Sequence, residues 1–163
     1  MATTNTNGIQ FEDNSAAVID ALKQAGVAWL YEAGGEIEAQ AKRNSRVDKG
    51  KTRNSFSYKV DESGGKATVG SPDENAIWEE FGTGVHAEQG NGGKTAWYVP
   101  VQGYTGNKKP TYQGKVVIVH GKNGVDYYKT DGKKGTRALF KAYESKKNAL
   151  KASYQNRVKG VTR

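Results

Sequence analysis

SAAVIDALKQAGVAWLYEAGGEIEAQAKR, residues 15–43, is the stretch that decides the fold class. Small and apolar residues recur there at spacings of three and four, which places them on one face of a long helix. Asp13, Asn14 and Ser15 are suitable residues to cap its start. Gly34-Gly35 weakens the helix, because glycine costs about 1 kcal/mol against alanine in a helix interior. We expect a kink or a close backbone contact there.

The middle of the chain is predicted to be mainly short strands. Residues 53–60 alternate in the manner of a strand, 61–65 form a turn, and 66–70 return. A short helix over 76–81 follows, with Ile77, Trp78 and Phe81 as its apolar side and Pro72 near its start. Further strands are expected at 95–101, 115–120 and 125–130. Asn123-Gly124 predicts a hairpin between the last two.

A second long helix is predicted over 137–156, with Thr136 as its cap. The fold class is therefore α+β: a long N-terminal helix and a C-terminal helix pack on a small antiparallel β-sheet with long loops. We expect residues 1–13 to be a flexible arm, 14–157 a single domain and 158–163 a basic tail.

The composition excludes several classes of protein. The 163 residues contain no cysteine, so disulfides and thiolate chemistry are absent. The first residues lack the pattern of a signal peptide, and no apolar run approaches the roughly 20 residues of a membrane span. We therefore expect no membrane association, and synthesis in a cytoplasm. The 21 glycines and 35% hydrophobic residues favour surfaces that become buried in an assembly.

Charge is distributed in blocks along the chain. Residues 1–41 have one base and six acids, and residues 60–93 have one base and seven acids. Residues 42–59 have seven bases and one acid, and residues 94–163 have sixteen bases and three acids. Such blocks favour either head-to-tail packing of like subunits or a basic surface that faces DNA.

Enzymatic motifs are incomplete. The run from Gly92 to Thr95 is similar to the end of a phosphate-binding loop, but Glu88 stands where the first glycine is required. His86 and His120 lack recognisable triad partners, and the acidic residues around His86 match no known metal spacing. We predict no catalytic residues, no cofactor and no metal.

Three stretches, in order, resemble the siphophage tail-completion family, also called head–tail connector or neck proteins. They are RVDKGKTRNS at residues 46–55, VGSP with NAIWEEFGTG at residues 69–72 and 75–84, and KTDGKK with RALFKAY at residues 129–134 and 137–143. Arg46 and Gly135 stand where many members have proline.

The resemblance implies a structural virion protein that forms a homo-oligomeric ring in the phage neck and completes the tail. A hexamer is expected, with a dodecamer as the alternative. Its partners would be head-completion proteins, tail-terminator or tail-tube proteins, and DNA that passes through the lumen without sequence recognition. The alternative, from the charge pattern alone, is a free sequence-independent DNA-binding protein, which would bind DNA with steep salt dependence and form no rings.

Two sets of residues are candidates for contacts. The first is a subunit interface, in which an acidic corner meets a basic neighbour: Arg46, Asp48, Lys49, Lys51, Arg53, Trp78, Glu79, Glu80 and Phe81. The second would touch DNA or a neighbouring ring: Lys141, Lys147, Lys151, Arg157 and Lys159. Purely structural roles compete with each: a turn at Gly50, a helix end at Gly82, core packing of the aromatics and a solvated face for the lysines.

Overall fold

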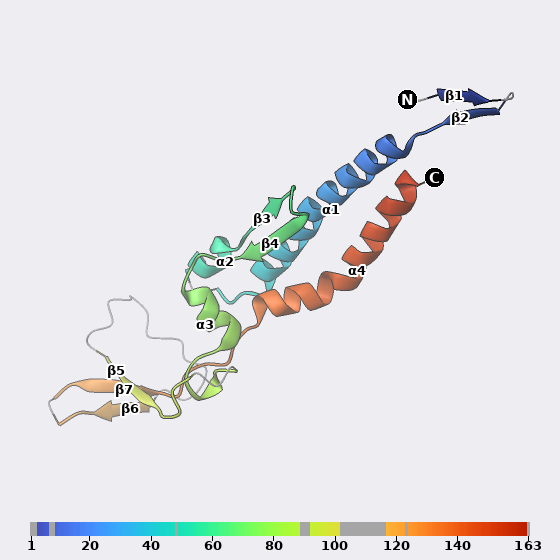
Figure 1. Cartoon of the computed structure of the whole chain (residues 1–163). Helices are drawn as coiled ribbons and strands as arrows, with labels where there is room; N and C mark the ends of the chain where they lie inside the picture. The colour runs from blue at the N-terminus through green and yellow to red at the C-terminus, as the bar shows by residue number, and fades with distance from the viewer. Residues whose placement is uncertain are drawn as a thin grey trace.

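The computed structural model describes residues 3–6, 9–47, 49–88, 92–101, 117–122 and 124–162. Its helices and strands follow one another along the chain as shown in Figure 1. Their bounds are β1 Thr3–Thr6, β2 Ile9–Glu12, α1 Ser15–Asn44, α2 Lys51–Ser55, β3 Ser57–Asp61, β4 Lys66–Gly70, α3 Asn75–Phe81, a 3-10 turn at Gly84–His86, β5 Trp97–Pro100, β6 Val117–His120, β7 Asp126–Thr130 and α4 Ala138–Val161.

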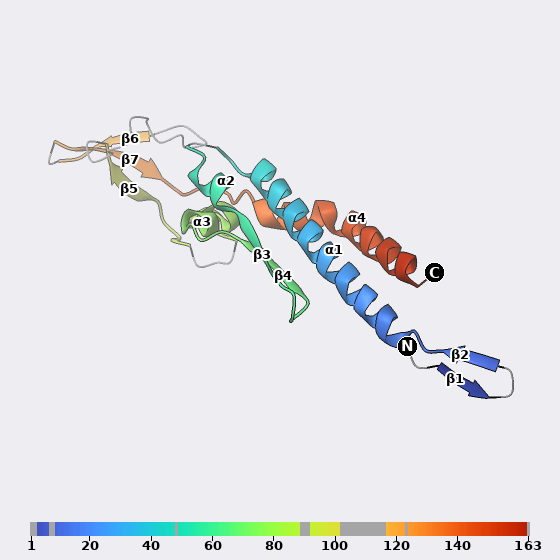
Figure 2. The ribbon, with the colours of Figure 1, turned by 90° about the horizontal axis from the view of Figure 1, so that it is seen from above.

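The two long helices, α1 and α4, pack side by side and run in opposite directions (Figures 1 and 2). At one end the Asn44 side chain donates to the Ala138 carbonyl at 3.1 Å. Further along, the Trp29 indole donates to the Leu150 carbonyl at 2.9 Å. These contacts join residues about a hundred positions apart, so the helix pair holds the two ends of the chain together.

The core lies where the end of α1 meets the start of α4. Ala41 and Ala142 are both completely buried there, beside Ala138 and the ring of Phe56. The small alanine side chains let the two helix backbones approach closely, and Phe56 fills the remaining space. Because close-packed interiors have little free volume, this crossing has no room for larger side chains.

The β3–β4 hairpin packs on α1 at the glycine pair. A Cβ at Gly34 would stand 2.5 Å from Cδ2 of Tyr58, so only glycine fits beneath this ring. The Tyr31 and Tyr58 rings meet edge to face at 6.4 Å. The helix continues through Gly34-Gly35, and of the two outcomes expected for this pair, a close contact is present.

The expected single sheet is wrong. The described strands form three separate antiparallel units: β1–β2, β3–β4 and the three-stranded β5–β7–β6. The adjacent pairing of β6 with β7 confirms the hairpin predicted across Asn123-Gly124. The β5–β7–β6 unit stands apart from the helix pair (Figure 1). Residues 3–6 and 9–12 of the expected arm also pair as strands.

Three element boundaries differ from the expectation. The strand predicted from residue 53 begins at Ser57, because Gly50, with φ of 77°, turns the chain into α2. Helix α3, expected over 76–81, is confirmed and begins one residue earlier, at Asn75. Pro72, expected at its start, lies before the helix, because the intervening Asp73 is held in a turn by the Thr52 and Ser71 hydroxyls. Helix α4 continues to Val161, so most of the expected basic tail is helical.

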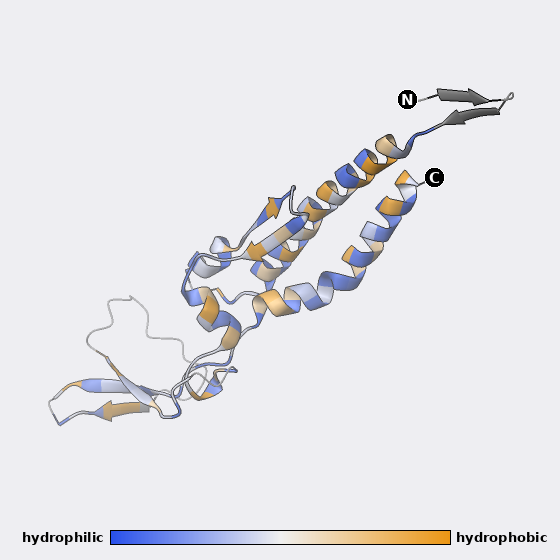
Figure 3. Cartoon of the chain, viewed as in Figure 1, coloured by the Kyte–Doolittle hydropathy of each residue, from blue (hydrophilic) through white to orange (hydrophobic). Residues whose placement is uncertain are grey.

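None of the helices in the described ranges is long and apolar enough to cross a membrane. Apolar and polar residues instead alternate along α1 and α4 (Figure 3).

The helix crossing generates a stability prediction. Ala142→Leu should lower the free energy of unfolding by about 1–3 kcal/mol, because the added side chain overpacks a fully buried site. Ala149→Leu, on an exposed position of the same helix, should change it by less than about 0.5 kcal/mol. Urea denaturation followed by circular dichroism measures both. Equal effects of the two variants would contradict the crowded crossing.

Candidate functional site

Two segments that overlap the stretches singled out in the sequence, residues 79–85 and 131–136, run beside each other between α3 and α4. The Thr83 amide donates to the Lys133 carbonyl at 2.8 Å, and the Val85 amide donates to the Asp131 carbonyl at 3.0 Å. In return, the Lys133 amide donates to the Thr83 hydroxyl at 3.1 Å. These bonds form a double-stranded connection, called here the glycine ribbon, between the helical body and the β5–β7–β6 unit (Figure 1).

Glycine is required where the two segments of the ribbon touch. Gly82 ends α3 with φ of 80°, which confirms the predicted helix stop, and a Cβ there would stand 2.8 Å from the Lys133 carbonyl oxygen. Gly84 and Gly132 have φ of 61° and 99°, and each faces backbone of the opposite segment. Positive φ and close approach both exclude larger residues at these positions.

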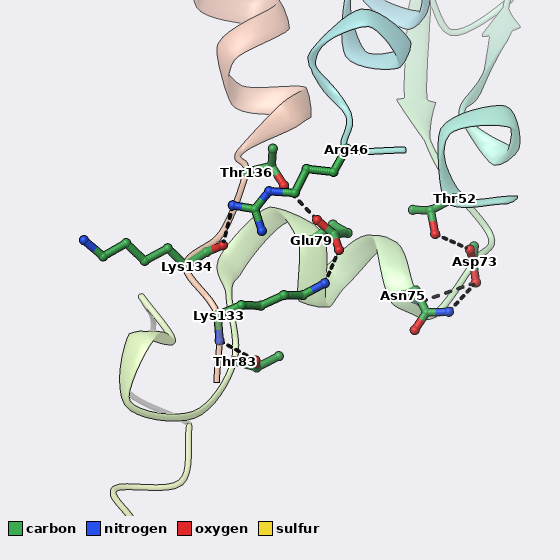
Figure 4. Close-up of polar contacts among 9 residues, drawn as sticks. All are labelled: Arg46, Thr52, Asp73, Asn75, Glu79, Thr83, Lys133, Lys134 and Thr136. Carbon is green, nitrogen blue, oxygen red and sulfur yellow. Dashed lines mark hydrogen bonds and ion pairs between the residues drawn. The ribbon is translucent and has the colours of Figure 1, made fainter. Parts of the chain in front are cut away.

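Glu79 is bound within its own chain. Its carboxylate pairs with the Lys133 ammonium and accepts a hydrogen bond from the Thr136 hydroxyl at 2.8 Å (Figure 4). Burial by itself raises the pKa of Glu79, but the bonds from Lys133 and Thr136 and the nearby charges of Lys133 and Arg46 outweigh it, so the pKa is lowered. Thr136, expected to cap α4, is therefore used to hold α3.

Glu80 replaces Thr136 as the cap of α4. Its buried carboxylate accepts hydrogen bonds from the Leu139 and Phe140 amides, each at 2.9 Å. A carboxylate at a helix start satisfies free amides and interacts favourably with the helix dipole. Arg137, in the left-handed conformation before α4, pairs with Glu88 at 3.1 Å and stacks over the Phe140 ring.

The basic residues of the expected interface lie around the start of α2. Lys51 is 3.7 Å from Asp73, and the Arg46 guanidinium donates to the Lys134 carbonyl at 3.3 Å. Lys49 is exposed, and Arg53 donates to the neighbouring Asn54 side chain. Asp48 lies outside the described residues. The chain itself thus brings Arg46 close to Glu79 and Lys51 close to Asp73.

Trp78 and Phe81 line an open groove beside α3, with Ile77 and Trp97. We call the groove lined by these four residues and by Gly82, Gly84, Gly92 and Gly93 the α3 groove. Its volume is about 750 Å³. The side chains are 52%, 37%, 60% and 40% exposed in the order named, so the apolar side expected for this helix is uncovered in the single chain.

The second set of candidates lies on α4 and divides between two faces. Arg157 turns toward α1 and pairs with Glu32, and Lys147 pairs with Glu144 at 2.8 Å on its own helix. Lys141, Lys151 and Lys159 are exposed. Successive residues of an α-helix are rotated by about 100° around its axis, so these three lysines fall within an arc of roughly 80° around α4. This arc lies on the side of α4 that faces away from α1.

The described part of the chain contains no group of three or more histidine or carboxylate side chains placed to hold a metal ion. His120 bonds Asp126 across the β6–β7 hairpin at 2.6 Å. Three carboxylates near His86 in the sequence make contacts within the chain: Glu79 binds Lys133, Glu80 caps α4 and Glu88 pairs with Arg137.

Sequence reasoning missed the partners of the acidic corner. Lys133 and Thr136 stand more than fifty positions from Glu79, and no local pattern links them. The one available signal was the occurrence of glycines in both motifs, at Gly82, Gly84, Gly132 and Gly135, which is what two closely approaching backbones require.

Residues 10–82 match a family model described as "Bacteriophage HK97-gp10, putative tail-component". The match runs from within β2 to Gly82, just after α3. It includes the first stretch that carried the resemblance and the second as far as Gly82, and the third, from residue 129, lies outside it. The resemblance to a siphophage tail protein family is thereby confirmed over this range. No curated protein and no solved structure shows significant similarity to the chain.

The glycine ribbon allows a matched pair of substitutions. Gly84 and Gly65 have the same φ of 61°, but only Gly84 faces backbone across the ribbon. Gly65→Ala should cost about 1–2 kcal/mol through the left-handed conformation alone. Gly84→Ala should cost more, because the opposite backbone must also move. Thermal unfolding of both variants measures the difference, and equal losses would show that the contact is unimportant.

The lowered pKa of Glu79 makes part of the stability depend on pH. Its folded pKa lies below the usual 4.5, so its contribution is present above that value and is lost as the pH falls through the folded pKa. Glu79→Gln should reduce the change in unfolding free energy between about pH 5 and pH 3. Glu74→Gln, at an exposed position beside α3, should not. Indistinguishable pH profiles for Glu79→Gln and wild type would contradict this role.

Proposed function

We propose that this chain, a structural protein of the phage tail type, forms a ring in the neck of a tailed bacteriophage, completes the tail and surrounds the DNA channel. The observation that carries the proposal is the match of residues 10–82 to a tail-component family. That match indicates a structural virion protein. The ring, its hexameric copy number and its contacts with head-completion and tail-terminator or tail-tube proteins are our inference.

The uncovered α3 groove supports assembly. Among the described residues few hydrophobic side chains are fully buried, whereas Trp78 and Trp97 are about half exposed. Large exposed apolar patches on soluble proteins mark interaction sites. Aromatic residues are also frequent energetic centres of interfaces. We therefore place Trp78 and Phe81 in contact with a neighbouring subunit.

The acidic and the basic residues of the expected interface have different roles in this proposal. Glu79 and Glu80 position α3 against α4, so their contribution to a subunit contact is indirect. Arg46, Lys49, Lys51 and Arg53 remain candidates to meet acidic groups of a neighbour. Asp48, outside the described residues, stays in the same set.

The outward face of α4 is the proposed contact with DNA. Lys141, Lys151 and Lys159 lie on one side of the helix, and contacts of this kind neutralise phosphates without reading bases. The same face supports the second candidate function, a free DNA-binding protein. Binding of that kind weakens steeply with salt and needs no ring.

Cryo-electron microscopy of particles from the parent genome tests the proposal. We expect a closed ring of this chain at the neck, with the lysine face of α4 directed to the DNA. Particles made without the chain should accumulate as filled heads and separate tails, and supplying the chain in trans should restore joining. If intact particles contain no such ring, the neck assignment fails. Salt-dependent binding of duplex DNA by the purified chain would then favour the second candidate.

A further inference from the structure

We propose that the α3 groove receives the first turns of α1 from a neighbouring copy of this chain. This inference rests on the proposed ring and specifies the contact that would build it. The groove and the start of α1 are two separate apolar surfaces that the single chain leaves uncovered.

The groove is shaped by the backbone as much as by its aromatic residues. Gly82, Gly84 and Gly92 line it together with Trp78 and Trp97. The glycine ribbon holds its floor in place, and Lys133, bound to Glu79, stands at its side. An apolar helix end therefore meets a prepared surface, and little ordering is needed when it binds.

The start of α1 is an amphipathic helix end without a partner. Residues 15–20 are all exposed, although Val18 and Ile19 are apolar. Hydrogen bonds from α1 to α4 occur further along the helix, at Trp29 and Glu32. Figure 3 shows hydrophobic colour both at this helix end and on α3. A helix of this kind is stabilised mainly when its apolar face packs against something.

The start of α1 lies toward one end of an elongated chain, and α3 lies near its middle (Figures 1 and 2). A contact between two different surfaces of the same chain is a head-to-tail contact, and repeated contacts of this type form a ring when the rotation between subunits closes. A two-fold dimer through the groove alone would leave the start of α1 uncovered. The placement therefore favours the ring.

Charge and exposed apolar surface agree with a second copy as the occupant. The start of α1 carries the exposed acids Asp13 and Asp20, in a block with one base and six acids. Exposed Lys94, from the strongly basic C-terminal block, lies in the hollow next to the groove. The four groove side chains are 37–60% exposed in the single chain, so seating a helix end on them would cover a group of large apolar side chains.

Disulfide trapping tests the contact directly, because the chain has no cysteine of its own. Ile19→Cys and Ile77→Cys are combined in one chain, which is supplied to particles in place of the natural chain. Mild oxidation should convert most of it into a ladder of cross-linked species that ends at the full ring. Disulfides form only between Cα atoms within about 7 Å, so the ladder reports a close contact. Ile19→Cys with Ile118→Cys, an exposed residue outside the groove, should give no ladder.

Two results would overturn the contact while leaving the ring intact. One is incorporation of the Ile19/Ile77 double variant without any cross-link, together with normal joining of heads and tails by Ile19→Glu. The other is dimerisation of Ile19→Cys alone, which would place α1 against α1.

We expect Ile19→Glu to lower the yield of infectious particles at least tenfold. Gln24→Glu, which adds the same charge at an exposed position of the same helix, should leave the yield unchanged. Absence of the natural chain from particles would instead remove the proposed function itself.

Discussion

The close approach of residues 79–85 to residues 131–136 is the constraint on which the arrangement of this chain depends. Backbones can meet at this distance only where side chains are missing, so glycines occur on both sides, among them Gly82 and Gly132. Once the segments are paired, Glu79 reaches Lys133 and Glu80 reaches the first amides of α4. The ribbon thus sets α3 against α4 and fixes the groove between α3 and β5.

Small residues allow the backbones of α1 and α4 to approach closely at the helix crossing, as glycines do in the glycine ribbon. Ala41, Ala138 and Ala142 allow α1 and α4 to pack closely, and Phe56 from the β3 side completes a small core. Such a core contributes limited hydrophobic stabilisation, because alanine buries little apolar area. Two of the three tryptophans, Trp78 and Trp97, stay exposed, and their burial in an assembly would add apolar burial that the isolated chain lacks.

The charge blocks have two different uses in the folded chain. Many acidic residues are bound internally, as Glu79 is to Lys133, Glu88 to Arg137 and Glu36 to Lys146. Lysines such as Lys141 and Lys151 are left exposed on the outside of α4. Blocks of opposite charge along a sequence therefore do not by themselves identify a contact between subunits, because the fold can pair them first.

The sequence by itself determined what depends on local spacing: the long helix from Ser15, the β6–β7 hairpin, the helix end at Gly82 and the α+β class. Helical and strand periodicity and glycine turns act over a few residues, so they are readable without a structure. Only the tertiary structure decided that the strands form three units, that Glu80 caps α4 in place of Thr136, and that Glu79 binds Lys133. The two glutamate contacts join residues more than fifty positions apart, and the pairing of strands and the partners of both glutamates depend on how backbones approach in space.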